Sequence, residues 1–350
     1  MKHTIIRTGL NTLYFSGLHH LMRLFVGGVG AILTLHHVRP RRRNRFQPNH
    51  LLEVTPEFFE GLIKRLRRSR RELISLDEMH QRMVSGSFKR RFICVTFDDG
   101  YRDVMEFAYP LLRKYEVPFA MYIPTSFPDR IGALWWVALE MVIAKSSLIG
   151  LSVNGKDQFF ECGSVREKRL LFNDIYTWLR GMKSEQELRK VVRDLAARQG
   201  LDIHDICKEL CMDWQELNQV AAEPLCTIGA HTVNHMMLKK LDSEQAVRAE
   251  MEMSRAVIEA ALGKRPQHLA YPIGDPTSAG QREFRIAAEL GFKTAVTTRP
   301  GVVFKAHREH LTALPRISVN GDYQNQRHLK VLMSGAATAM WNGFKRVNAA

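Results

Sequence analysis

Acidic residues are scarce relative to basic ones in this 350-residue chain, which has 36 Asp and Glu against 51 Lys and Arg. The formal net charge of +15 favours an anionic partner, such as nucleic acid, an acidic membrane face or an anionic polymer. Positive charge is concentrated in two runs, Arg39 to Arg45 and Lys64 to Arg71. Neither run is interleaved with aromatic residues, so a stacking surface for single strands is not indicated and no nucleic-acid partner is expected. A solvated helix face is the simpler interpretation of the second run.

Paired cysteines and long apolar runs are also missing. The five cysteines form no Cys-x-x-Cys pair, so no disulfide framework is predicted and a reducing compartment is favoured. Residues 1–29 are basic and apolar, but His19, His20 and Arg23 interrupt them, and no clear signal peptide or spanning helix is present. We therefore expect a cytoplasmic protein or one peripheral on the inner membrane, with residues 1–29 as the candidate membrane contact.

Strand-like and helix-like segments alternate through most of the chain. The strand-like segments are short apolar runs rich in β-branched residues: Ala31 to Val38, Phe92 to Phe97, Phe119 to Thr125, Leu225 to His231, His268 to Ile273, Lys293 to Thr298 and Leu314 to Val319. Helices are predicted from Pro56 to Leu73, with Thr55 as N-cap, and from Asp242 to Leu262, with Asp242 and Gln245 as a capping box. Residues 135–223 have mainly helical patterns and are predicted to form an insertion. The alternation implies an α/β barrel or a doubly wound sheet.

Two adjacent carboxylates follow one predicted strand in the stretch CVTFDDGYRD. The negative charges of Asp98 and Asp99 repel each other strongly if both are buried. Either a cation neutralises them, or the stretch is only a surface turn. His231 and His235, four residues apart, follow another predicted strand. Because the carboxyl ends of parallel strands meet, Asp99 and the two histidines can form a two-His, one-carboxylate metal site with open positions. Asp98 then stays free as a base for a water whose pKa the metal lowers from 15.7 to roughly 7.

Five motifs resemble those of the polysaccharide deacetylases, a carbohydrate esterase family. They are TFDDG (Thr96 to Gly100), HTVNH (His231 to His235), AYPIGD (Ala270 to Asp275), AVTTRPG (Ala295 to Gly301) and LPRISV (Leu314 to Val319). The resemblance implies a distorted (β/α) barrel that removes acetyl groups from N-acetylated sugars. It also implies one divalent metal ion, with zinc expected first and Co, Ni, Mn or Fe as alternatives.

The resemblance assigns roles to individual residues. Asp98 matches the family's catalytic base, and the metal ligands are matched by Asp99, His231 and His235. Tyr271 resembles a groove residue whose backbone N–H helps to hold the oxyanion, and Thr232 is expected to orient its loop. The implied organisation is an N-terminal segment at 1–29, a deacetylase domain at 30–134 and 224–325 with the insertion at 135–223, and a tail at 326–350.

The chain departs from the family pattern in two places. Many members have an arginine in the third motif that steadies the base, but here the stretch is AYPIG, as in the poly-N-acetylglucosamine branch; Arg316 is the candidate substitute, and a structural ion pair is its alternative role. The late Leu-x-His motif that supplies the general acid in most members has no convincing copy. LTLHHV resembles the Tyr-His opening of the same branch, where the motif order is permuted, so His36 is the candidate acid. Capping of the strand end by His36 or His37 is the alternative.

Two further groups of residues have competing interpretations. Trp135 and Trp136 open the insertion and could form a sugar-stacking platform or anchor the insertion in the core. His204, Cys207 and Cys211 imitate a zinc site, but no fourth ligand is in view and a packed amphipathic helix is the favoured interpretation.

The sequence therefore predicts a metal-dependent hydrolase that removes N-acetyl groups from an N-acetylhexosamine-containing poly- or oligosaccharide, with lipid-linked glycans among the candidates. Alternatives are a hydrolase of the same fold acting on another non-peptide C–N bond, a chitooligosaccharide deacetylase of the nodulation-factor type, and a non-catalytic glycan- or membrane-binding protein. The intact set of carboxylates and histidines argues against the last of these.

Overall fold

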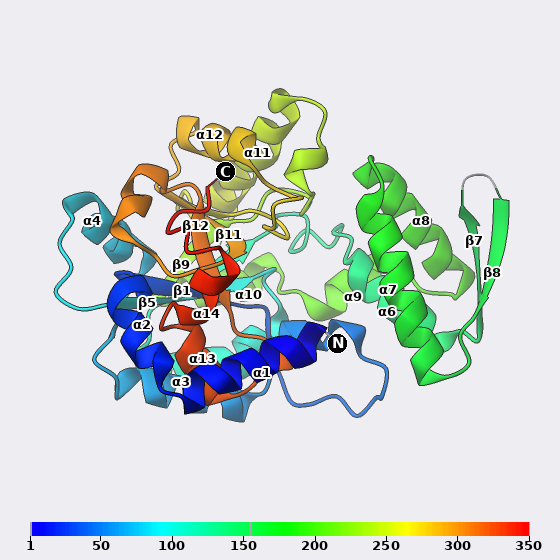
Figure 1. Ribbon diagram of the computed structural model, residues 1–350. Coiled ribbons are helices and arrows are strands. Elements are labelled where there is room, and N and C mark those ends of the chain that lie inside the picture. Colours follow the sequence, from blue (N-terminus) through cyan, green and yellow to red (C-terminus); the bar gives the residue numbers. More distant parts are fainter. Residues whose placement is uncertain (1, 154–155, 350) are drawn as a thin grey trace.

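The protein is built around a closed parallel β-barrel (Figure 1). The computed structural model describes residues 2–153 and 156–349. Within these residues, seven strands close the barrel in the order β1-β12-β11-β10-β9-β6-β5, and β1 pairs with β5 to complete the ring. The strands are β1 (Gly30–Leu35), β5 (Phe92–Asp98), β6 (Phe119–Ile123), β9 (Cys226–Ala230), β10 (His268–Ala270), β11 (Thr294–Pro300) and β12 (Leu314–Ser318). The predicted barrel is confirmed, and the doubly wound sheet is excluded because the strand ring closes.

Helices cover the outside of the barrel because they connect successive parallel strands. They include α3 (Pro56–Arg67), α4 (Leu76–Ser85), α5 (Tyr109–Lys114), α11 (Glu244–Leu262) and α12 (Gln281–Glu289). The Thr55 N-cap is confirmed, since its side chain accepts a hydrogen bond from the Phe58 N–H. The predicted capping box on α11 is wrong: Ser243 is the N-cap and accepts from the Ala246 N–H. A serine adjacent to the predicted Asp242 offers the same oxygen acceptor, so the residue type alone does not decide between them.

The insertion follows β6, and most of it lies to one side of the barrel, at the right of Figure 1. It contains α6 (Trp135–Lys145), α7 (Val165–Gly181), α8 (Glu185–Arg198), α9 (Ile203–Leu210) and α10 (Trp214–Ala221). An antiparallel hairpin of β7 (Leu148–Val153) and β8 (Lys156–Glu161) interrupts these helices, and the helical interpretation did not include it. The sequence signal for it is Asn154-Gly155, a strong hairpin dipeptide.

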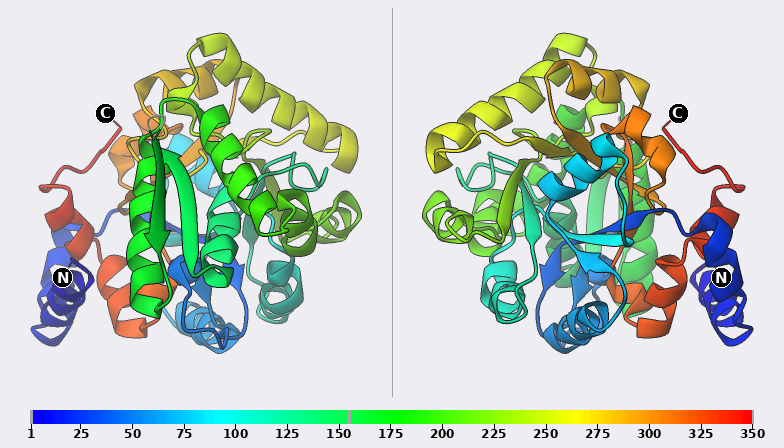
Figure 2. Two further views of the ribbon diagram at one scale, coloured as in Figure 1. Left: turned by 90° about the vertical axis from the view of Figure 1, so that its right-hand side faces the viewer. Right: turned by 90° about the vertical axis from the view of Figure 1, so that its left-hand side faces the viewer.

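The two ends of the chain lie on the same side of the molecule (Figure 2). α1 (Lys2–Phe15) and α2 (Leu18–Val26) pack with α13 (Gln326–Leu332) and α14 (Ala336–Trp341) around a small apolar cluster. Of the helices described, none combines the length and apolar character required to cross a bilayer. The domain limits inferred from the sequence stay predictions, although all seven barrel strands fall inside 30–134 and 224–325.

The strand ends place the candidate residues at one end of the barrel. β5 ends at Asp98, and β9 ends at Ala230, directly before His231. β6 and β9 pair side by side in parallel register, with Ile123 opposite Ala230. The loops after β5, β6, β9 and β10 therefore open toward the same carboxyl end, where barrel enzymes place their chemistry.

Candidate active site

Asp99, His231 and His235 form a buried three-residue cluster. Their candidate ligand atoms all lie within 4.8 Å of one another. The Asp99 Oδ1 atom is 3.5 Å from His231 Nε2 and 3.3 Å from His235 Nε2. The structure thus brings together the residues that the two separate motifs predicted.

The loops that present these side chains have unusual backbone conformations. Asp99 has φ 72°, Thr232 has φ 65° and His235 has φ 53°, all in the left-handed region that side chains other than glycine rarely adopt. The Thr232 hydroxyl accepts a hydrogen bond from the His235 N–H at 3.1 Å, which holds the loop in this shape. Such strain persists only where surrounding structure enforces it, and it is common at functional sites.

Two charged side chains that the motifs did not predict hold the histidine loop. Glu250 of α11 accepts hydrogen bonds from the Val233 and Asn234 N–H groups, at 3.0 and 2.9 Å. Arg189 of α8 donates to the Asn234 carbonyl at 2.6 Å, so the insertion also supports this loop. Neither residue lies in a recognisable motif, and only the fold shows that they reach the loop.

The cluster suits a divalent cation. Asp99 Oδ1 and His235 Nδ1 are buried and have no hydrogen-bond partner among the described residues. The His231 Nδ1–H donates to the Ala270 carbonyl at 2.7 Å, which leaves the Nε2 lone pair for a metal. Burial opposes ionisation of Asp99, but the two imidazoles hold its pKa well below the usual range. A cation would satisfy an ionised buried carboxylate that otherwise lacks a full set of partners.

Asp98 is held by Arg316 across the barrel interior. Two short contacts join the guanidinium to the carboxylate, Nη1 to Oδ1 at 2.7 Å and Nη2 to Oδ2 at 2.6 Å. Arg316 is itself oriented by the Thr297 carbonyl, which accepts from its Nε–H. Burial raises the pKa of Asp98, but the Arg316 charge outweighs burial, so the pKa lies below its ordinary value. Asp98 is therefore an ionised, rigidly oriented carboxylate beside the three-residue cluster.

Comparison with known proteins identifies the family. The family model for polysaccharide deacetylase matches residues 85–148 and 177–295, more than half of the chain. The chain belongs to the polysaccharide deacetylase family. It is also 33% identical over 92 residues to the poly-beta-1,6-N-acetyl-D-glucosamine N-deacetylase of Staphylococcus aureus strain MSSA476. That alignment covers 26% of this chain and 31% of the relative, so it spans less than a third of the curated protein's length.

Two solved structures share the fold. The Streptococcus pyogenes deacetylase PplD, in complex with acetate, aligns with TM-score 0.58 and 17% identity over 87% of this chain and 97% of that chain. IcaB from Ammonifex degensii aligns with TM-score 0.53 and 16% identity over 88% of this chain and 98% of that chain. At these identities the likeness shows the barrel fold alone.

The two histidines after β1 of this deacetylase-family chain have different surroundings. The His36 Nε2 atom is 3.9 Å from Asp98 Oδ2, and its side chain is partly exposed. The His37 ring is buried, stacks on Tyr101 and contacts Asp103 through Nδ1 at 2.6 Å. Burial lowers the pKa of His36, while the nearby Asp98 opposes that shift. Of the two, only His36 combines proximity to Asp98 with access from solvent.

The structure contradicts the oxyanion role predicted for Tyr271. Its backbone N–H donates to the Val296 carbonyl at 3.1 Å, because β10 and β11 are paired there. A donor used in the barrel ladder is not available to an oxyanion. In the same loop Ile273 has φ 63°, and its N–H has no hydrogen-bond acceptor among the described residues. The sequence signal that points to it is Gly274, which places Ile273, not Tyr271, directly before the motif's glycine.

Trp135 and Trp136 do not form an exposed platform, because they are only 2% and 7% exposed. The Trp136 ring centre lies 5.0 Å from that of His235, and the Trp135 ring packs on Tyr176 of α7. Anchoring of the insertion, with Trp136 against a candidate ligand, is the role that this burial favours.

The second candidate metal group does not assemble. Cys207 and Cys211 are buried, whereas His204 is exposed, and the described residues contain no metal-like cluster that includes them. The packed amphipathic helix is thus the better interpretation of HDICKELC.

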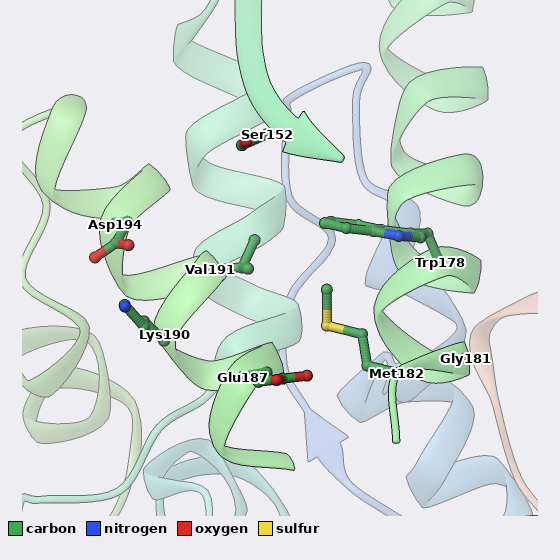
Figure 3. Close-up of a pocket in the computed structure, with 8 residues that line it drawn as sticks. All are labelled: Ser152, Trp178, Gly181, Met182, Glu187, Lys190, Val191 and Asp194. Carbon is green, nitrogen blue, oxygen red and sulfur yellow. The ribbon is translucent and has the colours of Figure 1, made fainter. Parts of the chain in front are cut away.

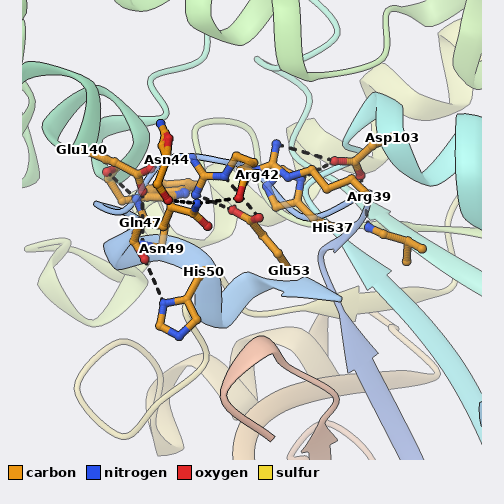
Figure 4. A network of polar contacts seen from close by, with 12 residues as sticks. His37, Arg39, Arg42, Asn44, Gln47, Asn49, His50, Glu53, Asp103 and Glu140 are labelled. Atoms are coloured by element: carbon orange, nitrogen blue, oxygen red, sulfur yellow. Dashed lines mark hydrogen bonds and ion pairs between the residues drawn. The ribbon is translucent and has the colours of Figure 1, made fainter. Parts of the chain in front are cut away.

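Part of the first basic run is tied into a polar network beside the site (Figure 4). Glu53 pairs with Arg39 and Arg42, both at 2.6 Å, and Arg42 also pairs with Glu140 of α6 at 2.6 Å. The exposed remainder of the run is Arg41, Arg43 and Arg45. The run is therefore partly structural: it joins the strand ends to the insertion.

A large groove lies within the insertion, away from these residues (Figure 3). Its volume is about 620 Å³, and it runs between the hairpin, α7 and α8. The residues that line it are Ser152, Trp178, Gly181, Met182, Glu187, Lys190, Val191 and Asp194. None of them belongs to the Asp98, Asp99 and histidine constellation, so the groove takes no part in the chemistry derived from it.

The ion pair between Asp98 and Arg316 is expected to stabilise the folded protein. Arg316→Gln leaves a buried carboxylate without its partner, and we expect the free energy of unfolding of chelator-treated protein to fall by roughly 3–5 kcal/mol at neutral pH, measured in urea. The double variant Asp98→Asn/Arg316→Gln is the control, and it should lose less because both charges are gone. Equal losses in the single and double variants would contradict this pairing.

The same pair makes a pH prediction. The pKa of Asp98 is lowered in the folded state. Its contribution to stability is therefore fully present above the unfolded carboxyl pKa of about 3.9 and is lost as pH falls through the lower folded value. The stability difference between the wild type and the double variant should stay constant near neutral pH and narrow only below about pH 4.

Proposed function

We propose that the protein is a metal-dependent hydrolase that removes N-acetyl groups from an N-acetylhexosamine-containing poly- or oligosaccharide. The observation that carries this proposal is the pairing of a buried Asp99–His231–His235 cluster with a second, arginine-held carboxylate, Asp98. Family membership and the relative named as a poly-beta-1,6-N-acetyl-D-glucosamine N-deacetylase support the substrate class. The direct test is acetate release from N-acetylglucosamine oligomers, with mass spectrometry to find the loss of acetyl units.

Asp99, His231 and His235 would hold one divalent ion, for which zinc is the expected identity. When bound, such an ion supplies a Lewis acid that lowers the pKa of water and polarises the amide carbonyl. The protein fixes the donor atoms in advance, through the Ala270 carbonyl on His231 and the Thr232 hydroxyl on the His235 backbone.

Asp98 acts as the general base in this proposal. It takes the proton of the water that adds to the carbonyl carbon, and Arg316 keeps the carboxylate ionised and oriented for that transfer. The Ile273 N–H is the proposed donor to the oxygen that gains negative charge, in place of Tyr271.

His36 is the proposed general acid. The C–N bond breaks to give acetate and an amine, and the amine nitrogen must gain a proton as it leaves. His36 lies 3.9 Å from Asp98 and is partly open to solvent, so it can reach the same reacting group from the mouth of the barrel.

The metal assignment predicts a loss of bound ion in two variants. His231→Ala and His235→Ala each remove one of three protein ligands, so metal content by elemental analysis should fall sharply. His204→Ala, which removes an exposed histidine of the insertion, is the matched control and should keep the wild-type content. Unchanged stoichiometry in both ligand variants would exclude this site.

The base assignment predicts that binding and turnover separate. Asp98→Asn has nearly the same shape but cannot accept the proton, so it should retain the metal and lose about 10²–10⁴-fold in kcat. Asp99→Asn should instead lose the metal. The reverse pattern would show that the two roles are exchanged, and circular dichroism should check that each variant is folded.

The acid assignment predicts a change in the pH–rate profile. An acid must be protonated to act, so the rate falls as pH rises through its pKa, and His36→Ala should lose this alkaline limb with its metal content intact. His310→Ala, on an exposed turn before β12, is the control and should keep the limb. A wild-type profile in His36→Ala would assign the acid elsewhere, with His37 the next residue to test.

A further inference from the structure

The helix α2 presents an apolar face to solvent. Leu18, Leu21, Leu24 and Phe25 are 44%, 59%, 69% and 69% exposed, and their spacing places them on one side of the helix. The buried His19 lies on the other side. An amphipathic helix normally turns its apolar side to the core, so this outward stripe indicates a contact with something outside the chain.

The apolar surface continues onto the C-terminal helices. Met340, Trp341 and Phe344 are each more than half exposed. α14 packs directly on α2, so closely that a Cβ at Gly335 would meet the Val26 carbonyl. More than half of the exposed large apolar side chains of the described residues lie in α1, α2 and this C-terminal stretch, which we call the terminal face. Figure 2 shows these segments together on one side of the molecule.

Positive charge without acidic partners borders the terminal face. The sequence has no Asp or Glu before Glu53 and none after Asp322. At the amino end of the barrel, Arg91 Nη2 donates to the Arg23 carbonyl at 3.0 Å, and Arg71 lies close enough to both for their positive charges to repel it. Burial, and then repulsion from Arg23, lower the pKa of Arg71 and Arg91, and no carboxylate of the described residues pairs with any of the three.

We propose that the terminal face docks on the surface of an anionic phospholipid bilayer, with Leu21, Leu24, Phe25 and Trp341 at the acyl boundary and the arginine cluster among the lipid phosphates. Leucine, phenylalanine and tryptophan beside arginine are the side chains that interfacial helices use. A second copy of the chain fits less well, because a symmetric dimer would bring two acid-free, cationic surfaces together.

The docked orientation, taken together with the proposed function, determines where the catalytic site lies relative to the membrane. α2 leads into the amino end of β1, whereas Asp99, His231 and His235 follow the carboxyl ends of their strands. The catalytic mouth therefore opens at the end of the barrel away from the docked arginine cluster. An enzyme bound in this way would act on glycan that extends beyond the headgroup layer.

Vesicle cosedimentation of the full chain tests the docking without any activity readout. We expect binding to vesicles of phosphatidylcholine and phosphatidylglycerol in equal parts, weakened by added salt, and little binding to phosphatidylcholine alone. Leu21→Glu/Phe25→Glu should lose at least about tenfold in binding, and Arg71→Gln about fivefold. The matched controls are Phe159→Glu/Leu170→Glu and Arg193→Gln, which change exposed residues of the insertion and should bind as wild type.

Tryptophan quenching locates the contact. Vesicles with brominated acyl chains should quench one part of the fluorescence, and Trp341→Phe should abolish that quenching, since the other four tryptophans lie in the insertion. Equal binding by the wild type and Leu21→Glu/Phe25→Glu, or quenching that persists in Trp341→Phe, would overturn the proposal. So would wild-type self-association in analytical ultracentrifugation that this double variant abolishes, if no vesicle binding is seen.

Discussion

Two carboxylates at consecutive positions are buried at the end of β5, and the rest of the site depends on how their repulsion is neutralised. Asp98 and Asp99 are each only 2% exposed, so water cannot screen them. Asp99 adopts a left-handed backbone conformation, so the two carboxylates point in different directions and each meets its own partners. Asp98 then meets the Arg316 guanidinium from β12, which is two positions from β5 in the strand ring, and Asp99 meets two imidazoles from the loop after β9.

The closed barrel is a condition for this arrangement. Arg316 belongs to β12, more than two hundred residues after Asp98, and it reaches the carboxylate because β1 is paired with both β12 and β5. β1, the first strand of the barrel, thus closes the ring between β12 and β5. His36 follows that same strand, which explains why it ends close to Asp98.

The sequence was most informative where a residue type has few alternatives. Adjacent aspartates and paired histidines at strand ends have a narrow chemical meaning, so the Asp99–His231–His235 cluster was predictable, as was the alternation that implies a barrel. Roles that depend on a single backbone hydrogen bond were not predictable. The Tyr271 N–H donates to the Val296 carbonyl because the hydrogen bonding between β10 and β11 extends one residue beyond Ala270. No sequence pattern predicts how far such pairing extends.

Burial was the second quantity that the sequence could not supply. Trp135 and Trp136 have the composition of a sugar platform, but aromatic rings serve a core equally well, and only packing distinguishes the two. The same limit applies to the first basic run, where Arg39 and Arg42 form partly buried pairs and their neighbour Arg41 is exposed.

The insertion leaves the strand pairing of the barrel intact, and it also supports the loops of the candidate site. β6 and β9 pair directly on either side of it, so its presence does not disturb the strands. It contacts the loops after β5 and β9. The Met212 N–H donates to the Gly100 carbonyl at 3.0 Å, and Arg189 donates to the Asn234 carbonyl. No proposed base, acid or metal ligand originates in it. Its contacts therefore act on the chemistry by fixing loop positions, and a change in the insertion can reach the site through the backbone alone.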